Sequence, residues 1–272
     1  MEQTHLQIDG NTIAVYESGG KGAAILLIHG QSVDAQTFRH QLGGDFGDNH
    51  RVVAFDLPGH GDSARAVNPE EVYRLPSYAR IVAELVNRLD LSRPVVAGWS
   101  LGGAIALEAA DQLPDAAGFF IIGTPPLGIP PAMEDVFLPN APVKLMHSPT
   151  LTEEQATVLA GALIRPGAEP PPSFREAILK SDGETRVQLV ANTVAGNYKD
   201  AVEIVSNMTV PLAVVHGAED QLVNVDYNRS LKMPTLWRGE VLVIEGAGHA
   251  PHWERPERFN TLLADFVADV SD

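Results

Sequence analysis

Residues 95–103 read Val-Val-Ala-Gly-Trp-Ser-Leu-Gly-Gly, and this stretch decides the fold. The apolar run Pro94–Gly98 is typical of a strand buried on both faces, and Leu101–Leu113 has the composition of a helix. Ser100 lies between them, with a glycine two residues before it and another two residues after it. Such glycines let neighbouring backbone pass close to a strained turn. We therefore expect the Ser100 hydroxyl to project above the end of a sheet as a nucleophile.

Strand-like and helix-like segments alternate on both sides of this turn. The expected strands are Thr4–Ile8, Thr12–Glu17, Ala23–Ile28, Val52–Phe55, Pro94–Gly98, Gly118–Gly123, Leu212–His216 and Val241–Glu245. The helices expected between and after them are Tyr78–Leu89, Leu101–Leu113 and Pro256–Val270. This alternation predicts an α/β fold with a mostly parallel central sheet flanked by helices.

The regular alternation stops in a proline-rich segment. Eleven of the twenty prolines lie within residues 124–175, and proline interrupts both core strands and long helices. Short helices are expected at Thr152–Leu163, with Thr152 as the N-cap, and at Ser173–Leu179. The segment also keeps many apolar residues, which argues against a disordered linker.

The chain has 272 residues, which is enough for one large domain or for a domain with a sizeable insertion. We predict a core made of residues 1–124 and 206–272. Residues 125–205 are predicted to form a mainly helical cap inserted into that core.

Charge and composition exclude several classes of function. The chain has 19 Lys and Arg against 35 Asp and Glu, a net charge of −16, which disfavours binding to nucleic acid or to an anionic membrane. The absence of cysteine excludes a disulfide scaffold, a cysteine nucleophile and a thiolate metal site. The first 20 residues do not resemble a signal peptide, and no apolar stretch could span a bilayer. We expect a cytoplasmic protein; the sequence does not indicate its oligomeric state.

A serine nucleophile needs a base, and the base needs a carboxylate that orients it. His249 follows the last predicted strand and is the expected base. Glu219 and Asp220 follow the strand before it. Asp220 is preferred because it is the third residue after the turn glycine, and Asp226 is a more distant alternative. We therefore predict Ser100, His249 and Asp220 as the catalytic residues.

The oxyanion of a tetrahedral intermediate needs hydrogen-bond donors. The backbone N–H of Leu101, next to the nucleophile, is one expected donor. The second is the N–H of Gln31, in the loop His-Gly-Gln-Ser (residues 29–32) after an early strand. His29 is expected to brace this loop rather than to act in catalysis.

The substrate is expected to contact the oxyanion loop, the Ser100 turn, the cap and the loop after the catalytic histidine. The residues predicted to bind it are Gly30, Trp99, Met133, Phe137, Leu159 and His252. The segment Asp56–Ser63 contains aspartates and a histidine, but its glycines and proline favour a tight structural turn over a metal site. No Gly-rich phosphate loop or metal-ligand spacing is present, and we predict neither a metal nor a cofactor.

Together these segments resemble the α/β-hydrolase fold family over essentially the whole chain. The resemblance rests on the Asp56–Gly61 turn, the Gly98–Gly103 turn, the Gly-x-x-Asp loop at Gly217–Asp220 and the Ala-Gly-His segment at Ala247–His249. The segments Gly98–Gly103, Gly123–Pro126 and Gly246–Pro251 also resemble the branch of N-acyl-homoserine-lactone lactonases, which open the lactone ring of quorum-sensing signals without a metal. Gln31 stands where that branch typically has asparagine, and residues 151–165 contain no tyrosine.

The resemblance implies a serine hydrolase of carboxylic esters or lactones, with a small neutral N-acyl-homoserine lactone as the expected substrate. The alternatives are a general carboxylesterase or a hydrolase of carbon–carbon bonds in aromatic degradation. A ligand receptor on the same fold is less favoured. The serine at position 100 excludes the chemistry of haloalkane dehalogenases and epoxide hydrolases, which need a carboxylate nucleophile.

Overall fold

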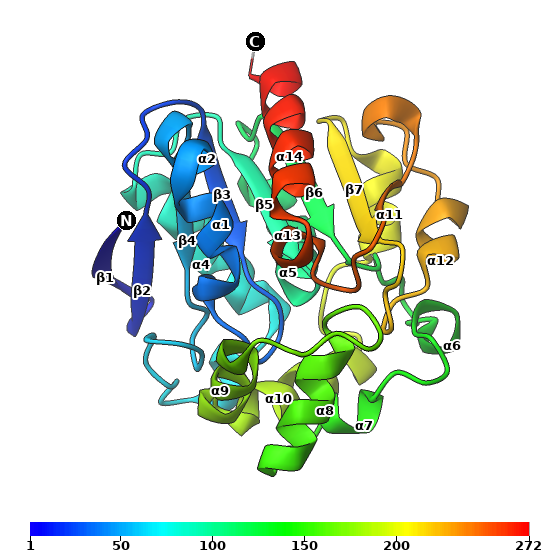
Figure 1. Ribbon diagram of the computed structural model, residues 1–272. Coiled ribbons are helices and arrows are strands. Elements are labelled where there is room, and N and C mark those ends of the chain that lie inside the picture. The colour runs from blue at the N-terminus through cyan, green and yellow to red at the C-terminus, as the bar shows by residue number, and fades with distance from the viewer. Residues whose placement is uncertain (272) are drawn as a thin grey trace.

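The central element of the computed structural model, which describes residues 1–271, is an eight-stranded sheet (Figure 1). The strands are β1 (Glu2–Ile8), β2 (Asn11–Glu17), β3 (Ala24–Ile28), β4 (Arg51–Phe55), β5 (Val95–Trp99), β6 (Gly118–Ile122), β7 (Leu212–Gly217) and β8 (Leu242–Ile244). Their order across the sheet is β1-β2-β4-β3-β5-β6-β7-β8. The pairs β1–β2 and β2–β4 are antiparallel and all other neighbours are parallel. The predicted α/β fold with a mostly parallel sheet is confirmed.

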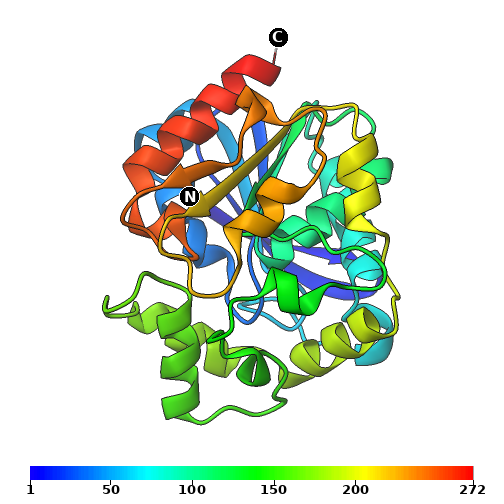
Figure 2. The ribbon, with the colours of Figure 1, turned by 90° about the vertical axis from the view of Figure 1, so that its right-hand side faces the viewer.

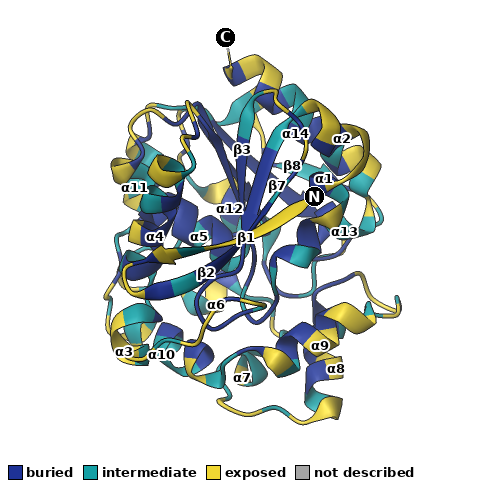
Figure 3. Cartoon of the chain, turned by 90° about the vertical axis from the view of Figure 1, so that its left-hand side faces the viewer, coloured by how far each residue is buried: buried dark blue, intermediate teal, exposed yellow. Residues whose placement is uncertain are grey.

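Burial distinguishes the middle of the sheet from its edge. Every residue of β5, β6 and β7 is buried, whereas most of β1 is exposed (Figure 3). Continuous runs of aliphatic and aromatic residues suit strands that helices cover on both faces. β1 carries polar residues along most of its length and pairs with one neighbour only. The apolar runs in the sequence therefore identify β5, which leads into the Ser100 turn, and the two strands that follow it in the sheet, β6 and β7.

Helices pack on both faces of this sheet. The α-helices are α1 (Arg39–Leu42), α2 (Gly44–Asn49), α3 (Pro69–Val72), α4 (Leu75–Arg88), α5 (Leu101–Glu108), α6 (Met133–Val136), α7 (Val143–Met146), α8 (Glu153–Ala162), α9 (Pro172–Lys180), α10 (Gly183–Val194), α11 (Ala201–Asn207), α12 (Val225–Ser230), α13 (Pro251–Glu254) and α14 (Pro256–Val270). The 3₁₀ helices are η1 (Ala35–Phe38), η2 (Ala110–Gln112) and η3 (Trp237–Gly239). Within residues 1–271, no helix is both long and apolar enough to cross a bilayer.

The two faces of the sheet carry two apolar layers. Consecutive residues of a strand point to opposite faces, so Phe119 packs with the residues of α4, α5 and α11 while Phe120 packs on α14. The ring of Phe120 lies 5.7 Å from that of Phe259 and 5.5 Å from that of Phe266, measured between centroids. This double layer holds β5, and with it the Ser100 turn, from both sides.

The helix after the turn is shorter than predicted. α5 ends at Glu108, and the chain continues as the 3₁₀ helix η2 instead of extending the α-helix to Leu113. Pro114 follows, and the residue before a proline is disfavoured in α-helical conformation. The proline therefore keeps Leu113 out of the helix, and the structure ends the α-helix earlier still, at Glu108.

Short helices form the proline-rich segment, as predicted. α7 to α10 gather beyond one end of the sheet (Figures 1 and 2). Thr152 caps α8 in a reciprocal capping box with Gln155. The helix α10 was not predicted. Because the apolar side chains of α11, which begins at Ala201, pack on the sheet with those of α5, the boundary of the cap 125–205 stays a prediction.

His252, on α13, lies in the apolar layer beneath the Ser100 turn and is 0% exposed. Its ring centroid lies 4.8 Å from that of Phe38, 4.6 Å from that of Trp99 and 5.8 Å from that of Phe259. Neither ring nitrogen has a hydrogen-bond partner within the part of the chain that the structure describes. Burial lowers the pKa of His252 to about 3, and the charges of His249 and His40 act in the same direction. His252 is therefore a neutral packing residue of the core.

We expect the substitution His252→Phe to make the stability of the protein less dependent on pH. An unfolded histidine has a pKa of 6.5, so between that value and about 3 the unfolded state binds more protons than the folded state. The wild type therefore loses stability as the pH falls, by about 2 kcal/mol near pH 5 relative to pH 8 from this residue alone. Phenylalanine has no such titration, so the variant avoids this loss.

Denaturant unfolding near pH 5 and near pH 8 measures this effect. The difference in unfolding free energy between His252→Phe and wild type should favour the variant by about 2 kcal/mol more at the lower pH. The exposed residue His5 provides the control variant His5→Asn. A difference between His252→Phe and wild type that is the same at both pH values would contradict the prediction.

Candidate active site

Ser100 occupies a strained turn between β5 and α5, with φ 54° and ψ −116°. Its N–H donates to the carbonyl of Ile122 over 2.8 Å, and its own carbonyl accepts from the Thr124 hydroxyl over 3.0 Å. A side chain at Gly98 would collide with the backbone of Gly102, and a side chain at Gly102 would collide with the carbonyl of Ile28. The two glycines of the sequence pattern are therefore needed because backbone approaches too closely for a Cβ atom.

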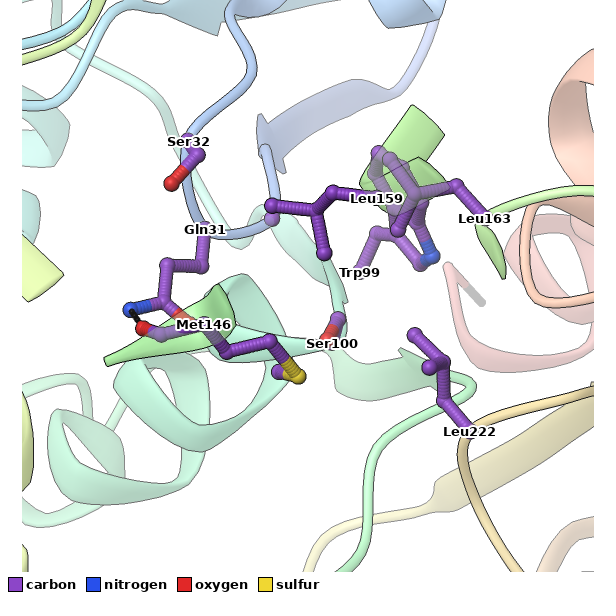
Figure 4. A pocket seen from close by; sticks show the side chains of 9 residues that line it. Gln31, Ser32, Trp99, Ser100, Met146, Leu159, Leu163 and Leu222 are labelled. Atoms are coloured by element: carbon purple, nitrogen blue, oxygen red, sulfur yellow. Dashed lines mark hydrogen bonds between the residues drawn. The ribbon is translucent and has the colours of Figure 1, made fainter. Parts of the chain in front are cut away.

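A narrow pocket opens at this turn (Figure 4). Of the residues predicted for the site, Ser100, Gly30, Gln31, Trp99 and Leu159 line it. The other residues of the lining were not predicted from the sequence; they are Ser32, Met146, Leu163 and Leu222. Spacing offered a signal for one of them, since Leu163 lies one helical turn beyond Leu159. The wall opposite Ser100 is apolar.

Three residues predicted to bind substrate lie elsewhere. Met133 and Phe137 are at α6, where Phe137 forms a β-bridge with Val223 and so packs against the loop after β7. His252 lies in the core on the far side of Trp99, as described above. His252 was predicted to line the pocket because it lies three residues after His249. In the structure its ring, on α13, points into the apolar layer and away from the pocket.

The structure brings His249 and Asp220 together. His249 Nδ1 donates to Asp220 Oδ2 over 2.7 Å, and the Asp220 side chain is only 4% exposed. Asp220 Oδ1 accepts from the backbone N–H groups of Leu222 and Val223 over 2.8 and 3.0 Å. Glu219 is exposed and does not share this position. Of the two carboxylates after β7, Asp220 is therefore the one that contacts His249, and its role as the catalytic acid stays a prediction.

The carboxylate of Asp220 stays ionised in spite of its burial. Burial acts to raise its pKa, but the opposing effect of His249 and His216 is larger and holds the pKa of Asp220 below its usual value. Asn228 Nδ2 donates to the carbonyl of Thr124 over 2.8 Å and lies 2.9 Å from His216 Nε2. That arrangement makes Nε2 the acceptor and puts the ring proton on Nδ1, 3.8 Å from Asp220 Oδ2. Two imidazole N–H groups therefore face one carboxylate.

His249 is held on the other side by the Ser100 turn. The indole N–H of Trp99 donates to the His249 carbonyl over 2.8 Å. Gly123, at φ 54°, lies so close that a Cβ atom there would come within 3.0 Å of the His249 ring. His249 Nε2 has no partner among residues 1–271. His249 Nε2 therefore makes no hydrogen bond to Ser100 in this structure.

The oxyanion loop is braced from below, as the sequence analysis expected of His29. The backbone N–H of Leu57 donates to His29 Nε2 over 2.9 Å, so the ring proton is on Nδ1, which donates to the Gly30 carbonyl over 2.7 Å. That carbonyl belongs to the peptide whose other end is the Gln31 N–H. Neither the Gln31 N–H nor the Leu101 N–H has an acceptor within the described residues. Both predicted oxyanion donors are therefore free.

The segment Asp56–Ser63 is a structural turn, as predicted. The Asp56 carboxylate accepts from the N–H of Ala35 and the N–H of Asp62, both over 2.8 Å. The Ser63 hydroxyl donates to the Asp56 carbonyl over 2.6 Å. This hydrogen bonding occupies the Asp56 carboxylate and ties the turn to the start of η1 at Ala35.

Comparison with known proteins agrees with this geometry. Solved structures of the N-acyl homoserine lactonase AidH are 33% identical to this chain over 99% of its length and 98% of theirs, with a TM-score of 0.95. They include a serine-to-glycine variant complexed with N-hexanoyl homoserine lactone and a complex with N-butanoyl homoserine.

Curated relatives share lower identity. The dihydrolipoyllysine-residue acetyltransferase component of the acetoin cleaving system of Pseudomonas putida is 27% identical over 96% of this chain and 68% of its own length. The pimeloyl-acyl-carrier-protein methyl ester esterase of Xylella fastidiosa (strain 9a5c) is 26% identical over 93% of this chain and 98% of its own length.

A family model described as the alpha/beta hydrolase family matches residues 25–262. The match runs from β3 to α14 and so includes the Ser100 turn, the Asp220 loop and His249. This chain belongs to the alpha/beta hydrolase family.

Proposed function

We propose that this enzyme hydrolyses carboxylic esters and lactones through Ser100, His249 and Asp220, and that N-acyl-homoserine lactones are its substrates. The observation that carries the proposal is the buried 2.7 Å hydrogen bond between His249 and Asp220, beside a strained serine turn that opens on a pocket. A nucleophile, an orienting acid and a base, in this order along the chain, are the parts that acyl transfer by a serine on this fold requires.

The proposed reaction has two halves. In the first, His249 Nε2 takes the Ser100 proton while the hydroxyl oxygen attacks the carbonyl carbon, and the N–H groups of Gln31 and Leu101 bind the oxyanion. Collapse of the tetrahedral intermediate breaks the bond to the alkoxide, which receives the proton from His249. In the second half, water attacks the acyl-enzyme in the same way and releases the acid. With a lactone the leaving alcohol stays attached to the acyl group, so the product is one hydroxy acid.

Two features favour lactones with an acyl chain. The pocket wall formed by Met146, Leu159, Leu163 and Leu222 is apolar and suits a hydrocarbon chain. The similarity to AidH, seen with a lactone and with a ring-opened homoserine, extends over the whole chain. The second candidate is a general carboxylesterase, which the likeness to a methyl ester esterase favours.

Replacing the nucleophile tests the mechanism. We expect Ser100→Ala to lower kcat for an ester or lactone by about 10³-fold or more, because the covalent step is lost. A fluorophosphonate probe should label the wild type and leave Ser100→Ala unlabelled. The exposed Ser230 provides the control variant Ser230→Ala, which should keep both activity and labelling. Labelling of Ser100→Ala would refute the serine mechanism.

A paired substitution tests the acid. We expect Asp220→Asn to lower kcat by about 10³- to 10⁴-fold, because an amide neither orients the His249 tautomer nor stabilises the imidazolium. Glu219→Gln, one residue earlier and exposed, should keep kcat within about twofold. Steady-state kinetics on one substrate compare the two variants. A larger loss in Glu219→Gln than in Asp220→Asn would assign the acid role to Glu219.

A substrate panel tests the lactone proposal. We expect acid release from N-acyl-homoserine lactones of several chain lengths, with kcat/KM above that for p-nitrophenyl acetate, because the apolar wall binds a long acyl chain, which the acetate lacks. Proton release at constant pH measures both classes. Turnover of the acetate ester with no opening of any homoserine lactone would support the general carboxylesterase instead.

A further inference from the structure

A buried arginine outside the proposed catalytic residues joins the cap to the oxyanion loop. Arg186 lies on α10 and is 2% exposed. A buried guanidinium normally requires a carboxylate partner or full hydrogen bonding, because its desolvation is costly. Within residues 1–271, no carboxylate oxygen lies within ion-pair distance of Arg186, and all of its hydrogen bonds go to carbonyl and hydroxyl oxygens.

These hydrogen bonds reach three separate segments. Arg186 Nε donates to the carbonyl of Ser148 over 2.6 Å and Nη2 to the carbonyl of Pro149 over 3.3 Å. Nη1 donates to the Ser181 hydroxyl over 2.9 Å and to the Ser32 hydroxyl over 3.2 Å. The planar fork of the guanidinium serves all of these acceptors at once, which a lysine ammonium cannot do in the same geometry.

Ser32 is the position where this contact affects the site. It follows Gln31, the proposed oxyanion donor, and it has φ 63°, a region that a non-glycine residue occupies only when its surroundings hold it there. Its N–H donates to His60 Nε2 over 3.2 Å, and its hydroxyl accepts from Arg186. The core therefore holds the backbone N–H of Ser32 through His60, and the cap holds its hydroxyl through Arg186.

A second contact connects the same two segments. Gln31 Nε2 donates to the carbonyl of Met146 over 3.1 Å, the bond drawn in Figure 4. Met146 ends α7, and Ser148 and Pro149 follow it. The chain 146–149 is therefore bound by the oxyanion loop at its beginning and by Arg186 at its end, while Arg186 also binds that loop.

From this geometry we propose that Arg186 is a positioning residue, which sets the oxyanion loop Gly30–Ser32 for catalysis by fixing Ser32 against the cap segment 146–149. The proposal rests on the proposed serine hydrolase function. Arg186 does not line the pocket, so its loss leaves the apolar wall in place. Its effect is on the alignment of the Gln31 N–H with the oxyanion, which forms only in the transition state.

The test compares two hydroxyls that bind the same nitrogen of Arg186. Ser32→Ala removes the contact with the oxyanion loop and keeps a Cβ atom at the strained position. Ser181→Ala removes the contact within the cap and is the matched control. We expect Ser32→Ala to lower kcat about tenfold with KM within about twofold, and Ser181→Ala to leave kcat unchanged, with similar decreases in unfolding temperature. Arg186→Lys should lower kcat at least as much as Ser32→Ala.

A boronic acid inhibitor provides a second readout, because it forms a tetrahedral adduct on the serine that presents an oxygen to the oxyanion donors. Ser32→Ala should weaken its inhibition by the same factor as kcat/KM, and Ser181→Ala should not. Equal kcat in the two serine variants, or losses that follow only their unfolding temperatures, would overturn the role of Arg186. Activity of Ser100→Ala at the wild-type level would instead refute the proposed function, so the two failures are distinguishable.

Discussion

The turn at Ser100 depends on backbone packing that tolerates no side chain on either side of the serine. Gly102 lies against the carbonyl of Ile28 at the end of β3, and Gly98 lies against Gly102 itself. This close approach draws the start of α5 onto the ends of two parallel strands and keeps a non-glycine residue at a positive φ. The hydrogen bond from the Ser100 N–H to Ile122 then ties the turn to β6. Trp99, just before the serine, holds His249 through the hydrogen bond from its indole N–H to the His249 carbonyl.

The buried titratable groups around the turn differ in charge: the carboxylate of Asp220 is ionised, whereas the imidazoles of His29 and His60 are neutral. Asp220 is kept ionised by His249 and His216, so the carboxylate that accepts from His249 carries its charge within the protein interior. Burial lowers the pKa of His29 to about 4 and that of His60 to about 3, so both stay neutral and serve as fixed donors and acceptors for the oxyanion loop. The site therefore combines one buried anion with neutral imidazoles whose tautomers are set by backbone partners.

Much of the fold could be predicted because its signals are local. The apolar runs of β5 and β6, the glycines around Ser100 and the N-cap at Thr152 depend on neighbouring residues only, and the structure has each of them within one residue of where the sequence indicated. The early end of α5 and the helix α10 were missed. The apolar, alanine-rich composition of α5 continues past Glu108, so composition did not mark where the helix ends. The division into core and cap could not be derived from proline content alone, because α11 has the sequence position of the cap but packs on the sheet.

In the site, too, local sequence patterns identified the residue types, whereas contacts between distant residues appeared only in the structure. The sequence by itself determined which residue types could act: a serine in a glycine turn, a histidine after the last strand and two adjacent carboxylates. Only the tertiary structure decided that Asp220 and not Glu219 meets His249, that His252 enters the core, and that Met146 and Leu222 line the pocket. The contact between Arg186 and Ser32 joins residues 154 positions apart. No local pattern encodes such a pair, because the direction of a side chain is set by the packing of elements that are distant in sequence.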